Sequence, residues 1–475
     1  MRNVTAAMMN KQEIRYPDAP VSDELGGVDT SLLYDELRTR YGATGRAVEV
    51  DFRRLVDWVR LGDQLSHQVH SYPAKLLPNI AHFFANARIL ARAGQPLLDP
   101  FCGSGTVALE ASVAGLLPYV ADANPLALLL TRVKTTPFDS RQLRAALASI
   151  RNRARRFRTA LVVPIVNDHL WYLPHQKKRL EVVLRAILEE PDELLRDFFK
   201  VSFSTTARRL SLSDLAVSVP VRLLPKPHLE ALRNQRINER LQWIREADPL
   251  VEFIRTAEAN IYRVEETNRQ YPSRVTAISV GIDARNLRQP ASENDPLPDR
   301  SVRLIVTSPP YGSAQKYIRA SSLSLNWLNL AGPDELADLE ALSIGREHLS
   351  RIRDADKSPA PLSKAFRNLI KQIEAINPLR ARITQRYLEE MRSAVAEMSR
   401  VVEVGGHVVV VIGNNRVCGL ALRNDKFLME SFAESGMRLE VSLVDHIKSR
   451  GLMTKRNKTA SVISRESVLV FVRTA

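Results

Sequence analysis

A run of four residues, Ser-Pro-Pro-Tyr at positions 308–311, has the composition of a site for chemistry on an amino group. It follows an apolar run, so Pro309 and Pro310 would hold the Ser308 hydroxyl and nearby carbonyls rigid at the end of a buried strand. An amino group on a heteroaromatic ring is a poor nucleophile, because its lone pair is delocalised into the ring. The Ser308 hydroxyl and the Pro309 carbonyl could accept its hydrogens and direct the lone pair, while Tyr311 stacks on the ring.

Without its context the same tetrapeptide is more typical of a simple turn or of a proline-rich ligand. Its place after a buried strand, and downstream of a second motif, favours the chemical interpretation. That second motif lies in residues 97–115, LLDPFCGSGTVALEASVAG, which predict a strand, a tight turn and a helix. Gly103 and Gly105 let the turn approach a ligand closely. No Gly-Lys-Ser/Thr follows, and the third glycine of GxGxxG is missing, which favours a sulfonium ligand over a phosphate.

Two aspartates follow later strands of the same pattern. Asp122, about twenty residues after the turn, could accept hydrogen bonds from both hydroxyls of a ribose. Asp283 could bind an exocyclic amine such as that of adenine. Each also has a structural interpretation: Asp122 as a helix N-cap, a role that Asn124 could take instead, and Asp283 as a turn residue.

The segments around these residues alternate between strand and helix, which predicts a parallel, doubly wound sheet. Three further strands are predicted near the carboxyl terminus, in GGHVVVVIGNN, RLEVSLVDHIK and ESVLVFVRT. Between about 136 and 273 the alternation stops and the pattern is mostly helical. Helical spacing is also predicted over 32–61 and in a helix that ends at Gly94, after a polar arm at 1–30.

The composition points to a polyanionic partner. The 475 residues include 68 Lys and Arg against 53 Asp and Glu, a formal charge of +15, and nucleic acid is the leading partner. The two cysteines, Cys102 and Cys418, lack the spacing of a zinc site or a disulfide framework, so no metal is expected. No apolar stretch of about 18 residues occurs, which predicts a cytoplasmic protein without a membrane contact.

The motifs DPFCGSGT and TSPPY together resemble the DNA amino-methyltransferases that use S-adenosyl-L-methionine, specifically the cytosine-N4 group. The resemblance covers residues 65–135 and 273–475. It implies an α/β fold, a Rossmann-like doubly wound seven-stranded methyltransferase sheet with a largely helical inserted recognition region. It also implies cofactor-binding positions at Tyr72, Lys75, Asp99, Phe101, Gly103, Gly105, Asp122 and Asp283, and a catalytic loop at Ser308, Pro309, Pro310 and Tyr311.

This resemblance divides the chain into an N-terminal helical arm (1–64), a cofactor half (65–138), an inserted target recognition domain (139–272) and a catalytic half (273–475). The insertion is rich in arginine, and its side chains would contact DNA phosphates unless they form only a solvated surface. The segment 321–402 is also long and basic enough to share this surface. The expected DNA-binding residues are Arg153, Arg155, Arg156, Arg208 and Arg209.

The predicted reaction is direct methyl transfer to N4 of a cytosine flipped out of double-stranded DNA, because neither cysteine lies in the Pro-Cys setting that methylation at C5 requires. A cognate restriction endonuclease or another phage-defence partner would accompany such an enzyme. Three alternatives stay open from the sequence: adenine-N6 methylation, against which Ser308 argues; RNA amino-methylation; and a DNA-binding protein that keeps the fold without catalysis.

Overall fold

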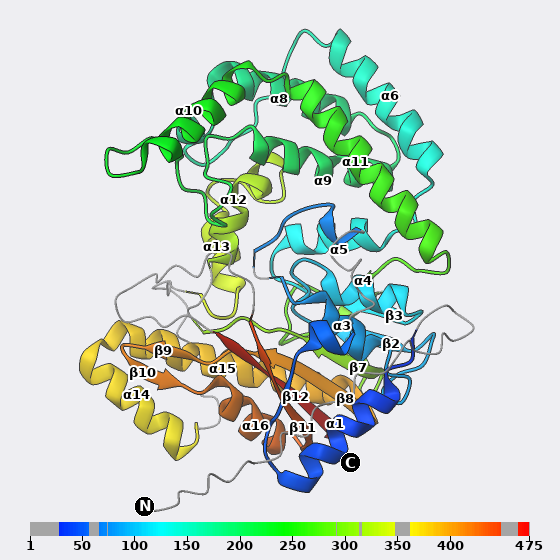
Figure 1. Cartoon of the computed structure of the whole chain (residues 1–475), viewed down its shortest axis with the longest axis vertical. Coiled ribbons are helices and arrows are strands. Elements are labelled where there is room, and N and C mark those ends of the chain that lie inside the picture. The colour runs from blue at the N-terminus through cyan, green and yellow to red at the C-terminus, as the bar shows by residue number, and fades with distance from the viewer. Residues whose placement is uncertain are drawn as a thin grey trace, which may run out of the picture.

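An eight-stranded sheet lies at the centre of the lower half of the molecule, and a helical region lies above it (Figure 1). The computed structural model describes residues 28–56, 66–73, 75–290, 292–312, 316–346, 362–447 and 464–474. Across the sheet the strands run β1 (Val48–Val50), β11 (Met437–His446), β12 (Arg465–Arg473), β8 (Val402–Ile412), β7 (Val302–Thr307), β2 (Pro96–Asp99), β3 (Leu117–Val120) and β4 (Ile278–Ser279). All neighbours are parallel except β12, which is antiparallel to both β11 and β8.

The sheet has eight strands where the resemblance implied seven, and one of its edges is formed by β1, which lies beside β11. The helical spacing predicted over 32–61 holds for α1 and α2 but was wrong at β1, which separates them. Helix α1 (Ser31–Thr44) ends at Gly45, which has a left-handed backbone (φ 61°), and the valines of β1 then pair with the sheet before the short α2 (Phe52–Leu55). Residues 1–27 of the expected polar arm, and 57–64 of the expected helical arm, lie outside the described residues.

The helix expected to end at Gly94 is also shorter than predicted. After the 3₁₀ turn Ser66–Gln68, α3 spans Pro78–Ala85, and the Asn86 side chain donates to the carbonyl of His82 at its end. The chain from Asn86 to β2 consists of turns. An amphipathic pattern alone could not show where a side chain would compete with the helix for a carbonyl.

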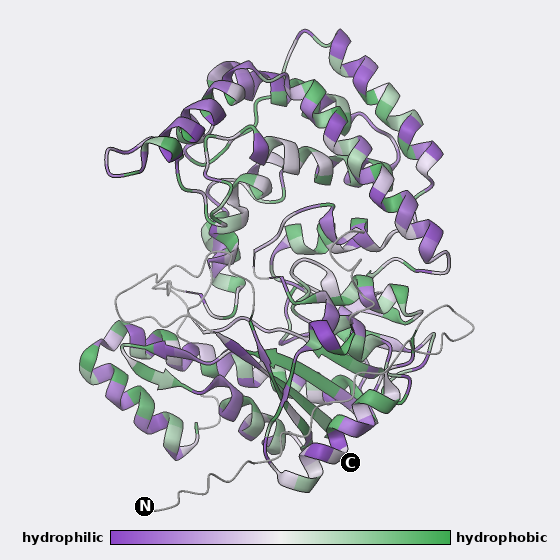
Figure 2. Ribbon diagram, viewed as in Figure 1, coloured by the Kyte–Doolittle hydropathy of each residue, from purple (hydrophilic) through white to green (hydrophobic). Residues whose placement is uncertain are grey.

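The sheet is buried on both faces, as expected for parallel strands. In β8, Val409 and Val411 join one core, which includes residues of α1, α2, α3 and α4 (Thr106–Val113). Val408, Val410 and Ile412 join the core on the opposite face, with α14 (Lys364–Ile376), α15 (Pro378–Val401) and α16 (Asn424–Glu434). Figure 2 shows the strands as a predominantly hydrophobic layer, and two small hairpins, β5–β6 (Arg288–Gln289, Ser292–Pro296) and β9–β10 (Asn415–Val417, Leu420–Leu422), lie outside it.

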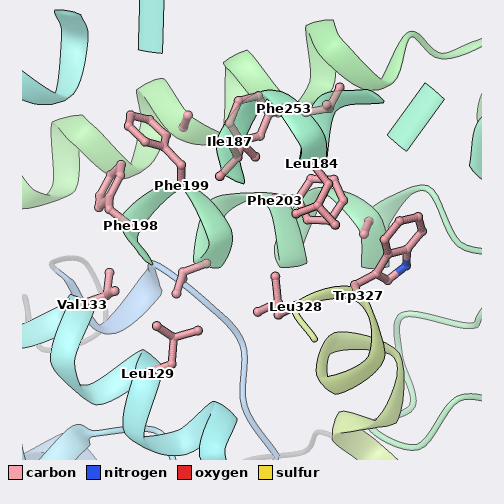
Figure 3. Close-up of a cluster of buried hydrophobic side chains, with 14 of the residues drawn as sticks. Leu129, Val133, Leu184, Ile187, Phe198, Phe199, Phe203, Phe253, Trp327 and Leu328 are labelled. Atoms are coloured by element: carbon pink, nitrogen blue, oxygen red, sulfur yellow. The ribbon is translucent and has the colours of Figure 1, made fainter. Parts of the chain in front are cut away.

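The helical region comprises α6 (Ser140–Arg156), α7 (Asp168–Trp171), α8 (Pro174–Leu188), α9 (Glu193–Arg209), α10 (Ala231–Glu246) and α11 (Pro249–Gln270). Two later helices, α12 (Tyr317–Trp327) and α13 (Leu336–Leu342), join it from the catalytic half of the chain. Aromatic residues of α9 and α11 pack with Trp327 and Leu328 and reach Leu129 and Val133 of α5 (Pro125–Thr135), as Figure 3 shows. One continuous apolar core thus connects the helical region to α5, the helix that follows β3 in the chain.

Candidate functional site

A pocket opens at the carboxyl ends of β2, β3 and β7 and in the loop after β4. The strand order reverses between β2 and β7, and ligands of doubly wound folds bind at such a switch point. The pocket holds about 670 Å³ of empty space, part of it open to solvent. Its lining is contributed by Tyr72, Pro100, Phe101, Gly103, Asp122, Ala123, Asn124, Ile282, Asp283, Ala284, Ser308, Pro310, Tyr317, Leu342, Ser343 and Ile344.

The tight turn after β2 forms one wall of this pocket. Gly103 adopts a positive φ of 46° and lines the pocket, where an added Cβ would lie 3.4 Å from the ring of Tyr72. Gly105 (φ 73°) does not line it: an added Cβ would lie 2.7 Å from the Thr131 hydroxyl and 2.9 Å from the Thr131 Cα. The structure thus gives Gly105 a packing role between α4 and α5, and its contact with a cofactor stays a prediction.

Asp122 lies where a ribose-binding carboxylate is expected. Its Oδ2 accepts the backbone N–H of Gly103 and its Oδ1 that of Asn124, both at 2.8 Å, so it holds the turn against the end of β3. Burial raises the pKa of Asp122 to about 6. The alternative role as N-cap of α5 belongs to Asn124, whose side chain accepts the N–H of Leu126 at 3.1 Å. Each Asp122 oxygen keeps acceptor capacity for a ligand hydroxyl.

Asp283 also lines the pocket, but its carboxylate is largely occupied by Arg285. The Arg285 side chain donates to both carboxylate oxygens at 2.8–3.1 Å, and its backbone N–H donates to Oδ1 at 2.9 Å. The same guanidinium reaches Glu390 of α15 at 3.2 Å. Asp283 thus forms the turn that its structural interpretation predicts, and its contact with an adenine amine stays a prediction.

The other expected cofactor positions divide into two groups. Tyr72 and Phe101 line the pocket, and Asn124 donates to the Tyr72 hydroxyl at 3.0 Å. Asp99 and Lys75 do not line it. Asp99 is only 3% exposed and lies beneath the turn, and burial raises its pKa to about 7. Asp99 would therefore affect a ligand indirectly, through Phe101 and Thr307, to which it is hydrogen-bonded.

The Ser-Pro-Pro-Tyr loop meets the pocket from the end of β7. Ser308 and Pro310 line the pocket, while Pro309 is buried behind them. The Tyr387 hydroxyl of α15 donates to the Pro310 carbonyl at 3.0 Å, and the Asn415 side chain donates to the carbonyl of Gly312 at 2.6 Å. Among the described residues no donor occupies the Pro309 carbonyl. The loop is therefore held from behind, while its two expected acceptors are kept for a ligand.

Tyr311 points away from the position where it was expected to stack on a base. Its hydroxyl donates to Oε1 of Glu466 at 2.7 Å, and its ring packs on the core beneath the sheet end. The aromatic ring at the pocket wall on this side belongs to Tyr317, at the first position of α12. Sequence reasoning missed Tyr317; an aromatic residue at the start of the helix after the motif was the available signal.

A second group that sequence reasoning missed lies beneath the turn. The ammonium of Lys134 is fully buried and donates to the Ser104 carbonyl at 2.7 Å, and burial lowers its pKa to about 7. Glu110 of α4 lies between two histidines, with His67 Nε2 at 2.6 Å and His82 Nδ1 at 3.0 Å. Lys134 therefore anchors the turn, and Glu110 ties α4 to the 3₁₀ turn and to α3.

The arginines expected to contact DNA have different surroundings. Arg155 and Arg156 are exposed at the end of α6, which lies at the outer edge of the helical region in Figure 1. Arg153 instead donates to the Ala186 carbonyl and to Glu190, both at 3.1 Å, and so joins α6 to α8 and the turn after it. The other two are tied into the helical region as well. Arg208 donates to the Val217 carbonyl at 3.1 Å, and Arg209 pairs with Glu252 at 3.2 Å.

Neither cysteine is placed for nucleophilic chemistry. Cys102 is buried within the turn, where burial raises its pKa well above its usual range, and Cys418 is half-buried in the turn between β9 and β10. Across the described ranges of the chain, no group of three or more His, Cys, Asp or Glu could hold a metal ion. No helix in these ranges is long and apolar enough to span a membrane.

The known proteins that this chain resembles include methyltransferases. Residues 66–149 match the model of the RMKL-like methyltransferase domain family. The type II methyltransferase M.MvaI of Kocuria varians is 24% identical over 426 residues, 84% of this chain and 88% of that protein. M.MjaII of Methanocaldococcus jannaschii, also a type II methyltransferase, is 27% identical over 110 residues, 22% of this chain and 20% of that protein.

Solved structures show only distant similarity. The rRNA methyltransferase aviRa of Streptomyces viridochromogenes aligns with a TM-score of 0.29 and 12% identity, covering 89% of this chain and 96% of that one. TTHA0409 of Thermus thermophilus aligns with a TM-score of 0.19 and 17% identity, covering 38% of this chain and 48% of that one.

The matched segment contains the elements that build one side of the pocket, including Tyr72, Phe101, Gly103 and Asp122. These residues fit a nucleoside-containing methyl donor, because carboxylate acceptors and apolar walls line the same pocket. Residues 66–149 of this chain are therefore similar to a methyltransferase domain, and the methyl donor is S-adenosylmethionine.

Proposed function

We propose that this chain is a site-specific DNA methyltransferase that transfers a methyl group from S-adenosylmethionine to the exocyclic N4 of cytosine in a flipped-out base. The observation that carries the proposal is one shared pocket. Ser308 of the Ser-Pro-Pro-Tyr loop lines it together with Phe101, Gly103 and Asp122 of the cofactor half. An amino group held by Ser308 would thus lie beside a methyl donor held by the turn.

The cofactor is proposed to lie along the ends of β2, β3 and β4. Asp122 would accept hydrogen bonds from the ribose hydroxyls, and Phe101 and Ile282 would cover the faces of the adenine. Tyr72 and Gly103 would lie near the sulfonium end of the cofactor. The remaining expected cofactor-binding residues, Lys75, Asp99, Gly105 and Asp283, would support these contacts. The bound cofactor supplies the electrophilic methyl group.

The protein would prepare the amino group for attack. The Ser308 hydroxyl and the Pro309 carbonyl would accept hydrogen bonds from the amino group, favour a pyramidal nitrogen and aim its lone pair. Pro310 fixes the loop through its bond to Tyr387. The base must leave the duplex to reach this pocket, at a cost of a few kcal/mol that binding has to recover.

Duplex DNA is the proposed substrate for three reasons. The net charge of +15 favours a polyanion, the relative that spans most of the chain is a type II methyltransferase, and exposed arginines such as Arg155 and Arg156 suit phosphate contacts. The helical region, residues 139–272 with α12 and α13, is proposed as the target recognition domain. We also propose that the protein acts in the cytoplasm and that a restriction endonuclease or another defence partner accompanies it.

The test is transfer of the methyl group to DNA. Purified protein is incubated with methyl-tritiated S-adenosylmethionine and mixed-sequence duplex DNA, and digested nucleosides are separated by mass spectrometry. We expect N4-methylcytosine, and strongly reduced label with the Ser308→Ala variant. N6-methyladenine would replace the cytosine assignment by the second candidate, because the same loop geometry suits both amines. Label in RNA alone, or none with any nucleic acid, would overturn the proposal.

A further inference from the structure

We infer that Glu390 of α15 is a positioning residue for the cofactor, because it binds Arg285 and Arg346, which hold two segments of the pocket wall. The inference rests on the proposed function, which places the adenine of S-adenosylmethionine against Ile282 in this wall. Glu390 itself does not line the pocket, and it is only 5% exposed. Its effect on the cofactor would therefore pass through the two arginines.

The two wall segments are far apart in the sequence. The β4 segment (residues 282–284) follows β4, and the α13 segment (residues 342–344) begins with the last residue of α13. All six residues line the pocket. From residue 343 to residue 346 the chain belongs to no helix or strand. The position of the α13 segment thus depends on the side chains that bind its backbone carbonyls, rather than on a regular hydrogen-bond ladder.

Arg285 joins the two segments directly. Its guanidinium donates to both carboxylate oxygens of Asp283 at 2.8–3.1 Å and to the Leu342 carbonyl at 3.3 Å. The same group lies 3.2 Å from Oε1 of Glu390. The N–H groups of one planar guanidinium point in several fixed directions, so one side chain can hold all three partners. A lysine could not reproduce this arrangement, because it has a single nitrogen.

Arg346 holds the next carbonyl of the α13 segment. Its Nη1 donates to the Ser343 carbonyl at 3.1 Å and to the two carboxylate oxygens of Glu390 at 2.8 and 3.0 Å. The consecutive carbonyls of Leu342 and Ser343 thus each accept a hydrogen bond from an arginine. Both arginines share Glu390 as a partner, so the loss of this carboxylate would loosen both bonds to the segment.

Helix α15 also holds the Ser-Pro-Pro-Tyr loop. Tyr387 precedes Glu390 by three residues, which places the two side chains on the same face of the helix. The Tyr387 hydroxyl donates to the Pro310 carbonyl at 3.0 Å. Gly345, just after the α13 segment, packs against both: an added Cβ would lie 3.4 Å from the Pro310 Cβ and 3.7 Å from the Tyr387 ring. One face of α15 therefore sets the α13 segment and the catalytic loop relative to each other.

A third arginine at the same carboxylate provides a matched control. Arg386 donates from Nε to Oε1 of Glu390 at 2.9 Å. Within the described ranges of the chain, Arg386 has no hydrogen bond to the β4 segment or to the α13 segment. Its loss would remove one ion pair from Glu390 and leave the bonds to both wall segments in place.

The experiment measures the affinity for S-adenosylhomocysteine, the product formed from the methyl donor, by calorimetry. Arg346→Ala is compared with Arg386→Ala, and Arg285→Lys with Arg386→Lys, because each pair makes the same chemical change at the same carboxylate. Glu390→Gln completes the set. We expect Kd to rise at least about tenfold for Arg346→Ala, Arg285→Lys and Glu390→Gln, and to stay within about twofold of the wild type for both Arg386 variants.

Steady-state methylation of duplex DNA gives a second readout. The KM for S-adenosylmethionine should rise in the same three variants, whereas kcat at saturating cofactor should stay within about threefold of the wild type. The reason is that Tyr387, which holds the Ser-Pro-Pro-Tyr loop, is unchanged in all of them. A lowered kcat with a wild-type Kd would contradict the inference, because the residues would then act on the reaction and not on cofactor binding.

A purely structural ion-pair cluster would make the three arginines equivalent. Equal changes in Kd for Arg346→Ala and Arg386→Ala, or wild-type Kd values throughout, would therefore overturn the inference while the methyltransferase activity stands. If Glu390→Gln does not fold, Arg285→Lys and Arg386→Lys still decide the question, since both keep a cation beside Glu390. A wild-type protein that binds S-adenosylhomocysteine but methylates no DNA would remove the proposed function, and the same Kd values would still decide the inference. Absence of binding by the wild type would overturn both.

Discussion

The Thr307 hydroxyl donates a hydrogen bond of 2.7 Å to the Asp99 carboxylate, which ties the end of β7 to the end of β2. The same oxygen, Oδ1, accepts the backbone N–H of Phe101 at 3.1 Å. One buried side chain thus holds the first residue of the pocket turn and the residue before Ser308. The relative position of the two motifs depends on Asp99 even though it does not line the pocket.

Asp99→Asn should change how stability depends on pH. The folded pKa of Asp99, about 7, lies above the ordinary value of 3.8, so the native state binds the proton more tightly than the unfolded state. Its stabilising contribution is present below pH 3.8 and is lost as pH rises through 7. Between about pH 5 and pH 8 the free energy of unfolding of the wild type should fall by roughly 1 to 3 kcal/mol relative to that of Asp99→Asn. Parallel denaturant titrations check this, and equal slopes with pH would show that Asp99 is not the titrating group.

Asp122→Ala should weaken S-adenosylmethionine binding by roughly 1 to 3 kcal/mol, because charge-assisted hydrogen bonds to the ribose are lost. The wild-type affinity should also fall as pH drops through about 6, where Asp122 takes up a proton and loses its charge. Calorimetry at pH 5, 6 and 8 measures both effects. An affinity for Asp122→Ala that matches the wild type at pH 8 would remove Asp122 from the cofactor site.

Two glycine variants should separate packing from binding. Gly105→Ala places a Cβ 2.9 Å from the Thr131 Cα at a positive φ, so we expect a loss of about 1 to 3 kcal/mol in the free energy of unfolding. Gly103→Ala meets only the Tyr72 ring at 3.4 Å and lines the pocket. Gly103→Ala should therefore lower the free energy of unfolding less than Gly105→Ala does, and it should weaken cofactor binding more. Thermal unfolding and calorimetry on both proteins decide this; a reversed order would exchange the two roles.

The α6 arginines should also divide into two classes. Arg153→Ala leaves the buried Glu190 without its 3.1 Å partner and should lower the free energy of unfolding by roughly 1 to 3 kcal/mol. Arg155→Glu with Arg156→Glu should leave stability within about 0.5 kcal/mol of the wild type. If this surface binds phosphates, the charge reversals will weaken DNA binding and flatten its salt dependence. An unchanged salt slope would mark Arg155 and Arg156 as a solvated surface.

Ser308→Ala should lower the single-turnover rate by one to three orders of magnitude, because one preorganised partner at a reacting centre is worth about 2.7 to 4 kcal/mol. The Pro309 carbonyl remains, so activity should not vanish in a sensitive assay. Cofactor affinity should barely move, since the proposed cofactor contacts lie on the turn and on Asp122. A wild-type rate would mean that the methyl acceptor binds elsewhere.

The positions of most strands and of the motifs along the chain could be predicted from the sequence because both depend on local patterns. Apolar runs marked β2, β7, β8, β11 and β12, and a glycine-rich turn marked the start of α4. Strand β1 could not be predicted, because three residues carry little periodic signal and its partner lies at the other end of the chain.

The sequence predicted the two loops that line the pocket, but it did not predict the direction of every side chain in them. Tyr311 was expected at the pocket wall. Its hydroxyl instead donates a hydrogen bond to Glu466, which lies 155 positions later in the chain, and the tyrosine that lines the pocket on this side is Tyr317. Arg153 was similarly grouped with its exposed neighbours because nothing local indicates that Glu190 lies opposite. Long-range polar pairs of this kind follow from the fold, which sequence patterns specify only coarsely.

The pairing of β1 with β11 also constrains how the protein is made. Val48 leaves the ribosome about 400 residues before its partner Leu443. At about 5 to 20 residues per second, β1 must wait roughly 20 to 80 seconds for its neighbour. Strand β1 is therefore synthesised long before it can pair, and this edge of the sheet closes only after β11 has emerged.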